Sequence, residues 1–227
     1  MTTGFLATVR LVLAKDLRTE LRSKELLATM LLFGAVLTFI FAFGFVNDPA
    51  TNRKVMPGAL WAALLFTGTL GVGRTFAREA DADAFTALVL SPADRAAVLL
   101  AKILGNLVLQ VVVLAFVLPL MAVMLRVDLE GVVGLVALQL FLGAVGFAVV
   151  GTPLAVMAVS ARFAEVLLPV VVFPLVVPVL IAGVKGTGVV LGTVIGDDPS
   201  PWISIMLAFD AFYGVAGLLL FDRMVSE

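Results

Sequence analysis

The chain has 227 residues, of which 62% are hydrophobic and 14% charged, and its mean hydropathy is +1.19. Because soluble domains are about half apolar, this composition excludes a water-soluble protein and indicates an integral membrane protein. The net charge of −1 excludes the basic excess typical of nucleic-acid binding, and the lack of cysteine and histidine excludes disulfides, the usual haem and metal ligands and histidine acid–base catalysis.

The N-terminal segment predicts an amphipathic helix on the membrane surface. Its apolar residues recur at spacings of three and four and form one stripe: Leu6, Val9, Leu13, Leu17 and Leu21. Lys15, Arg18 and Arg22 lie opposite this stripe. Arg10 and Glu20 interrupt the apolar side. The helix is either an anchor that fixes orientation or an elbow helix that transmits motion to the membrane-spanning bundle.

Six later segments are long and apolar enough to cross a membrane. A hydrocarbon core about 30 Å thick needs about 20 apolar residues at about 1.5 Å each. The segments are residues 26–46, 58–76, 97–125, 132–160, 164–184 and 202–221. The sequence therefore predicts an all-α integral membrane protein, with a cytoplasmic helix over residues 1–25 and a six-span transmembrane domain over residues 26–227.

The distribution of lysine and arginine predicts that the N-terminus lies inside the cell. In that orientation eleven of the fifteen basic residues are cytoplasmic, and four are outside: Arg53, Lys54, Arg126 and Lys185. An even number of spans returns the C-terminus to the cytoplasm. We expect no cleavable signal peptide, because Arg10 interrupts the first apolar run and the basic cluster follows that run.

A charged segment, residues 74–96, separates the second and third predicted spans. Its charged and aromatic side chains include Arg74, Phe76, Arg78, Glu79, Asp81 and Asp83. The spacing of Phe76 and the alanines after it predicts a short interfacial helix that ends in a turn. Ser91, Pro92 and Asp94 then predict the next helix start, with the Ser91 hydroxyl as the N-cap. From composition, the segment is either a solvated loop or a docking helix for a soluble partner.

Several polar residues and prolines lie inside the predicted spans. Asp210, in the last span, is either a proton relay or polar contact between helices, or a protonated or water-accessible carboxyl in a helix interface. Gln110 and Gln139 predict hydrogen bonds between helices. Three prolines in the fifth span predict a bent helix, which is either a hinge or an ordinary membrane helix: Pro169, Pro174 and Pro178.

The chain carries no motif for catalysis or nucleotide hydrolysis. GxxxxGK[ST], HExxH and GxSxG are all absent from it. We therefore predict a non-enzymatic protein that obtains any energy it uses from a partner.

Several motifs together suggest a known family. They are MPGALWAALLFTG at residues 56–68, Arg-Thr-Phe at 74–76, LVLSPADRAAVLLAKILGN at 88–106 and FPLVVPVLIAG at 173–183. In order and spacing, over essentially the whole chain, they resemble the haem exporter protein B (CcmB) family. That family usually has an acidic residue, glycine and a small hydroxyl residue where this chain has Ala82, Asp83 and Ala84. The coupling turn therefore lacks the backbone freedom of that glycine.

The resemblance implies a permease of the ABC-2 or type V exporter kind in the bacterial inner membrane. Such a subunit pairs with a second copy of itself and with a CcmA-like ABC ATPase, which binds the ATP. A CcmC-like haem-handling membrane subunit and a CcmE-like haem chaperone complete the complex. This chain would bind no cofactor, and it would couple ATP hydrolysis to haem trafficking or to release of the haem-loaded chaperone. Segment 74–96 and the elbow helix would receive the motion, and the bent fifth span would pass it outward.

Two other functions remain open on the sequence. A permease of the same architecture could export a lipid, a drug or a polysaccharide. An ion-coupled secondary carrier would work through Asp210, although the two halves of the chain show no obvious internal repeat.

Overall fold

The structure is a computed structural model of the chain, and it describes residues 4–45, 48–81, 94–158, 164–196 and 198–224. Every regular element among them is a helix. The helices are α1 (Phe5–Ser23), α2 (Glu25–Phe45), α3 (Pro49–Asp81), α5 (Arg95–Leu125), α6 (Val133–Ala158), α7 (Ala164–Val190) and α8 (Ser200–Met224). Helices α2 to α8 each carry a stretch long and apolar enough to span a membrane, which confirms the predicted fold class.

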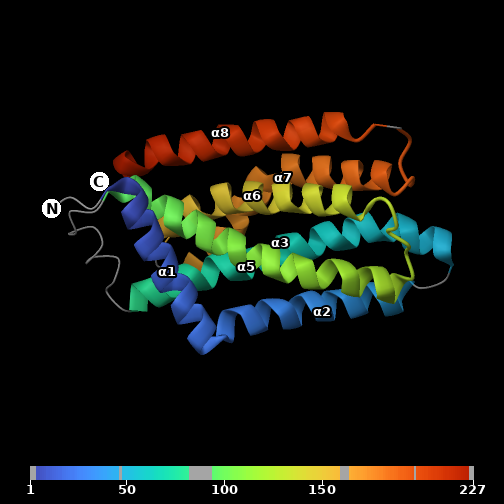
Figure 1. Cartoon of the computed structure of the whole chain (residues 1–227), viewed down its shortest axis with the longest axis horizontal. Helices are drawn as coiled ribbons and strands as arrows, with labels where there is room; N and C mark the ends of the chain where they lie inside the picture. The colour runs from blue at the N-terminus through green and yellow to red at the C-terminus, as the bar shows by residue number, and fades with distance from the viewer. Residues whose placement is uncertain (1–3, 46–47, 82–93, 159–163, 197, 225–227) are drawn as a thin grey trace.

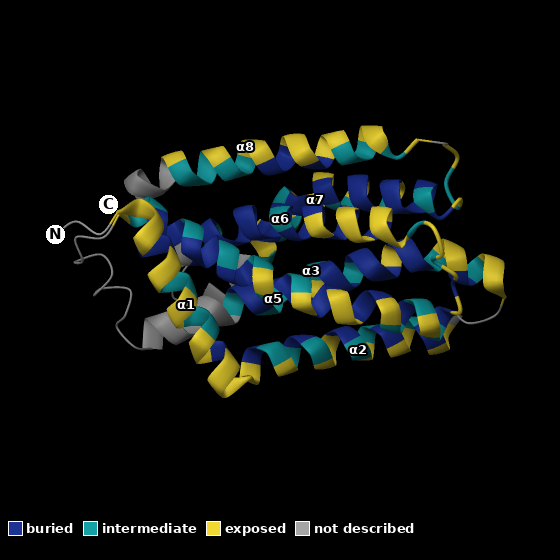
Figure 2. Ribbon diagram, viewed as in Figure 1, coloured by how far each residue is buried: buried dark blue, intermediate teal, exposed yellow. Residues whose placement is uncertain are grey.

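The six long helices run side by side, and α1 crosses the end of the bundle where both chain ends lie (Figure 1). Helices α3 and α6 form the centre, since 61% of the residues in each of their spans are buried, against 17% for α8. Helix α6 contacts α3, α5, α7 and α8. Figure 2 shows exposed residues along α1 and on the outer faces of α2 and α8, where lipid would cover the apolar ones.

The second spanning helix begins earlier and ends later than the sequence predicts. Asp48 accepts hydrogen bonds from the N–H groups of Ala50 and Thr51, at 2.9 and 3.0 Å, and Pro49 occupies the first helical position. The Thr51 hydroxyl, together with these amides, holds the pKa of Asp48 below its usual range. This capping signal lies upstream of residue 58, so α3 includes Pro57 as an internal residue.

The predicted separate interfacial helix at the start of the charged segment is wrong for the part that the structure describes. Helix α3 continues without a break through residues 74–81, and residues 82–93 lie outside the described chain. The N-cap of the next helix is Asp94 instead of Ser91. Asp94 has an extended backbone, and its carboxylate accepts from Ala96 N at 2.9 Å and from Ala97 N at 3.4 Å. A carboxylate in that conformation satisfies the first free amides directly.

Helix α7 contains all three predicted prolines and extends six residues past the predicted end of its span. Pro174 and Pro178 lie on its exposed side, whereas Val172, Val176 and Val179 are buried against the bundle. The backbone carbonyls that lose their helical partners to the prolines therefore belong to the outer half of the helix. Whether α7 acts as a hinge remains a prediction.

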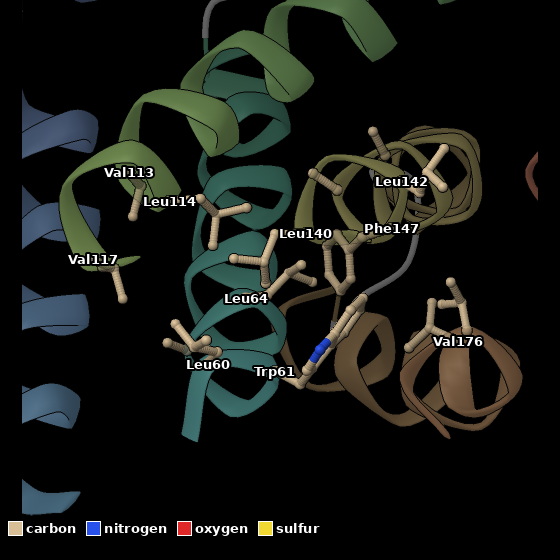
Figure 3. Packing of buried hydrophobic residues seen from close by; sticks show 14 of the residues in the cluster. Leu60, Trp61, Leu64, Val113, Leu114, Val117, Leu140, Leu142, Phe147 and Val176 are labelled. Carbon is tan, nitrogen blue, oxygen red and sulfur yellow. The ribbon is translucent and has the colours of Figure 1, made fainter. Parts of the chain in front are cut away.

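Trp61 of α3 is the largest side chain buried in the core and is 2% exposed. Figure 3 shows it pointing from α3 toward Phe147 of α6 and Val176 of α7. Its ring lies against Gly143 of α6 and Gly183 of α7, where an added Cβ would overlap with the indole.

A short polar chain extends from the same ring. Trp61 Nε1 donates to Thr187 Oγ1 at 3.0 Å, and Thr187 Oγ1 donates to Gln139 Oε1 at 2.8 Å. The predicted interhelical role of Gln139 is thus confirmed, since this chain of hydrogen bonds joins α3, α7 and α6.

Replacement of either glycine beside Trp61 should destabilise the bundle. We expect Gly143→Ala and Gly183→Ala each to lower the free energy of unfolding by about 1 to 3 kcal/mol, because the indole has no room to move away. Thermal unfolding of the purified protein in detergent would measure the change. Gly134→Ala, also in α6 but with no atom within 4 Å of the new Cβ, is the matched control. Equal melting temperatures for all three variants would contradict the packing described here.

Candidate functional site

The candidate site is the corner where α1 meets the bundle. Val9 of α1 is buried with Ala97 and Ala101 of α5. The two alanines are one turn apart, and their small side chains let the helix backbones approach closely. Four partly buried residues surround this contact: Val12, Leu13, Leu100 and Leu104.

The packing face of α1 is rotated away from the predicted apolar stripe. Leu6 and Leu21 of that stripe are 77% and 66% exposed, whereas Glu20 is 5% exposed. The sequence predicted that the stripe faces the membrane and did not predict which face of α1 packs on a helix, because lipid and a neighbouring helix both accept apolar side chains. Val9 and Leu13 of the stripe pack on α5. Lys15, Arg18 and Arg22 are exposed, as their predicted position on the opposite side requires.

A buried ion pair joins α1 to α5. Lys102 Nζ lies 2.7 Å from Asp16 Oδ2, and the Lys102 side chain is only 3% exposed, compared with 22% for Asp16. Lys15 Nζ contacts the other oxygen of the same carboxylate at 2.9 Å. A charge this deeply buried needs a partner of opposite sign, so the pair fixes where α1 sits along α5.

Glu20 fixes the corner between α1 and α2. Its Oε1 accepts a hydrogen bond of 2.8 Å from the backbone N–H of Leu27, in the first turn of α2. Lys24, the one residue between the two helices, takes a left-handed conformation with φ of 55° and donates its N–H to Glu20 O. The two helices are therefore joined by a short, capped turn, and displacement of α1 displaces α2.

Three polar residues of α5, which we call the α5 polar stripe, lie four residues apart: Lys102, Asn106 and Gln110. Asn106 Nδ2 donates to Thr152 Oγ1 of α6 at 3.1 Å. Gln110 Nε2 donates to Leu64 O at 2.9 Å and to Thr67 Oγ1 at 3.0 Å, both in α3. The predicted interhelical role of Gln110 is confirmed. The stripe as a whole connects α5 in turn to α1, α6 and α3.

Sequence reasoning missed Asp16, Lys102 and Asn106 as contact residues. The signal for Lys102 and Asn106 was their spacing of four from Gln110 within an otherwise apolar helix, which places all three on one face. The signal for Glu20 was its position on the apolar side of the helical wheel. No sequence pattern pairs Asp16 with Lys102, because 86 positions separate them and the contact requires the bundle.

The predicted coupling residues lie at the same end of the bundle as α1. Arg74, Phe76, Arg78, Glu79 and Asp81 belong to the last turns of α3. Asp83 and the rest of the predicted docking segment up to residue 93 lie outside the described residues. The role of these side chains in coupling stays a prediction.

Asp210 lies in the middle of α8, turned inward and 9% exposed. Its carboxyl contacts the backbone of α6 at Gly146, where an added Cβ would come within 2.7 Å of Oδ1. Among the residues that the structure describes, neither carboxyl oxygen has a hydrogen-bond partner. A role in proton exchange or in contact between helices stays a prediction. In the described part of the chain, no three residues of metal-binding type come together.

Comparison with known proteins supports a single family over nearly the whole chain. Residues 7–221 match the family described as CcmB protein. Heme exporter protein B of Pseudomonas aeruginosa is 28% identical over 173 residues, which cover 76% of this chain and 77% of the relative. Heme exporter protein B of Paracoccus denitrificans is 27% identical over 177 residues, which cover 78% and 81% of the two chains.

Replacement of Asp16 and replacement of Lys102 should destabilise the protein by different amounts. We expect Asp16→Asn to lower the free energy of unfolding by about 3 kcal/mol, because it leaves the more deeply buried ammonium without the carboxylate. Lys102→Met should cost about 1 kcal/mol, since Asp16 is partly exposed and keeps its contact with Lys15. The double variant should recover most of the loss. Chemical denaturation in detergent would test this order, and an Asp16→Asn variant as stable as the unaltered protein would contradict it.

Replacement of Asp210 should not destabilise the protein, in contrast to replacement of Asp16. Asp210→Asn should keep or raise the melting temperature, because the carboxyl oxygens have no hydrogen-bond partner among the described residues and an amide of similar shape removes the cost of ionising this buried group. The exposed loop variant Glu130→Gln, which also removes one negative charge, controls for net charge. A clear loss of stability in Asp210→Asn alone would show that the carboxyl has a partner that this arrangement does not contain.

Proposed function

The chain belongs to the CcmB protein family, and from this premise we propose that it is the permease subunit of an ABC-type complex in bacterial cytochrome c maturation. The observation that carries the proposal is the family match over residues 7–221, together with six long apolar helices around one core. The two relatives reported above are named heme exporter protein B. The subunit itself is non-catalytic, in keeping with a sequence that lacks a nucleotide-binding motif.

Energy enters this subunit from a CcmA-like ATPase on the cytoplasmic side. The receiving surface is the end of α3 with segment 74–96, where the acidic side chains Glu79, Asp81 and Asp83 meet the partner. The distribution of basic residues supports this orientation, since eleven of fifteen lie on the side assigned to the cytoplasm. Both chain ends are then cytoplasmic, and the membrane is the bacterial inner membrane.

Motion spreads from that surface through the polar contacts of the site. The Asp16 to Lys102 ion pair makes α1 move together with α5, and the Glu20 cap makes α1 move together with α2. The α5 polar stripe carries the displacement to α6 and α3.

The complex binds and transfers haem, and this subunit contributes movement to that process. A chain without histidine or cysteine lacks the common axial ligands of haem iron, which suits a subunit that transmits movement. A CcmC-like membrane subunit and a CcmE-like chaperone hold the haem, and a second copy of this chain completes the permease. ATP hydrolysis in the partner then drives release of the haem-loaded chaperone.

Charge reversal at the receiving surface tests this proposal. The variant Glu79→Lys, Asp81→Lys and Asp83→Lys should reduce recovery of the ATPase with the purified subunit by about 100-fold, because like charges across an interface cost several kcal/mol. Cytochrome c assembly should fall with it. The control reverses Asp128 and Glu130, two exposed acidic residues of the loop between α5 and α6 at the other end of the bundle.

Two results would count against the proposal. If the triple variant recovers as much ATPase as the control, these acidic residues do not form the docking surface. An unchanged yield of holocytochrome c in cells that lack this chain would remove the assigned pathway, independently of the docking surface.

A further inference from the structure

Helix α1 separates its charges between two faces. A shallow groove on the side away from the bundle is lined by Arg10, Lys15, Arg18 and Arg22, with alanine, leucine and threonine side chains between them. All four basic residues are exposed. The acids of the same helix are turned inward, where Asp16 contacts Lys102 and Glu20 caps α2. Lys15 is paired with Asp16 at 2.9 Å, so Arg10, Arg18 and Arg22 supply the cationic groups of the groove.

The starts of two spanning helices, α2 and α5, lie beside the groove. Helix α1 packs on the first three turns of α5, from Ala97 to Gly105. With 31 residues, α5 is about 46 Å long, which exceeds a hydrocarbon core of about 30 Å by about 16 Å. The charged residues within α5, Arg95 and Lys102, both lie in its half at the α1 end, so the excess length is assigned to that end. Helix α2 also begins its span at Glu25, directly after α1.

The exposed apolar residues of α1 support the same placement. Leu6 and Leu21 lie on the edge between the packing face and the groove, on the arc that an interfacial helix immerses in acyl chains. At about 100° per residue, Arg10 falls between Leu6 and Leu21 on the helical wheel, and Arg18 follows about 60° beyond Leu21. The apolar edge and the basic groove thus meet where acyl chains meet phosphates.

We propose that this groove is a binding site for anionic phospholipid headgroups in the leaflet at the α1 end of the bundle. Arg18 and Arg22 are one helical turn apart, so their guanidinium groups can bind the same phosphate, and each offers paired N–H donors that match phosphate oxygens. Arg10 adds a second phosphate contact two turns earlier. The site needs neither haem nor ATP, and it is independent of the function proposed above.

The site would hold the outer face of α1 while the inner face is tied to α5. A bound anionic lipid stabilises the docked position of α1, because any ligand that binds only the folded arrangement favours it. The anionic lipid content of the membrane then sets how easily α1 leaves α5.

Lipid binding to the purified full-length chain tests the proposal. Native mass spectrometry would compare bound phosphatidylglycerol with bound phosphatidylcholine of the same acyl chains. The test variant carries Arg10→Gln, Arg18→Gln and Arg22→Gln, and Lys15 is kept because it contacts Asp16. The matched control removes three exposed basic residues at the opposite end of the bundle, with Arg53→Gln, Lys54→Gln and Arg126→Gln.

We expect the unaltered chain and the control to prefer phosphatidylglycerol, and the test variant to lose that preference. Each basic residue near an anionic surface contributes about fivefold to binding, so the triple change should reduce phosphatidylglycerol affinity by well over tenfold. The effect should weaken as salt is raised, since surface charges are screened. If the triple variant does not fold, the single variants Arg18→Gln and Arg22→Gln should each show the fivefold loss.

Three results would overturn the site. Equal binding of the two lipids by the unaltered chain would show that it has no preference for anionic lipid. Equal losses of phosphatidylglycerol binding in the test and control variants would show that the preference depends on total charge and not on this groove. Loss of ATPase recovery in the test variant without any change in lipid preference would assign the groove to a protein partner instead.

Discussion

The arrangement of the bundle depends on the accommodation of Trp61 among three helices. Between membrane helices the hydrophobic effect gives no net attraction, because lipid tails are as apolar as leucine side chains, so close packing and hydrogen bonds must hold the helices together. Gly143 and Gly183 leave the space that the indole fills, and Thr187 accepts its N–H. A large rigid ring between two positions without side chains admits few alternative registers, so α3, α6 and α7 form one central unit.

Helix α5 attaches to this unit through polar groups whose hydrogen bonds lipid cannot replace. The α5 polar stripe contacts three different helices within two helical turns. An unpaired polar group in hydrocarbon costs several kcal/mol, so each contact specifies a partner as well as contributing to stability. Charge and hydrogen bonding therefore hold the helices together at the end of the bundle that carries α1. In the centre, the close packing of Trp61 holds them together.

This division suits a subunit that transmits force. Helix α1 is attached to α5 by an ion pair and a small apolar cluster and to α2 by a capped turn, so it can move as a lever while the Trp61 unit stays intact. The acids of α1 make contacts within the protein, and its exposed arginines, Arg10, Arg18 and Arg22, face outward toward a partner. The same segregation of charge underlies the mechanical role and the lipid site that we propose for this helix.

Hydropathy was sufficient to predict the all-α fold and the six spans, and the spacing of apolar residues predicted a surface helix before them. The reason is that a lipid-exposed backbone must satisfy its own hydrogen bonds, so a long apolar stretch has few structures other than a helix. The interhelical roles of Gln110 and Gln139 followed from the same rule. Helix boundaries did not follow from it, because the Asp48 and Asp94 caps, and not the ends of the apolar runs, set where α3 and α5 begin.

The site at the α1 corner was decided by the tertiary structure. An apolar stripe can face either lipid or another helix at similar free energy, so the wheel of α1 did not distinguish its exposed Leu6 and Leu21 from its buried Val9. What selected the packing face was the buried ammonium of Lys102, which needs a carboxylate and finds Asp16 only when α1 lies across α5. A contact between charges so far apart in the chain exists only once the bundle has brought the two helices together.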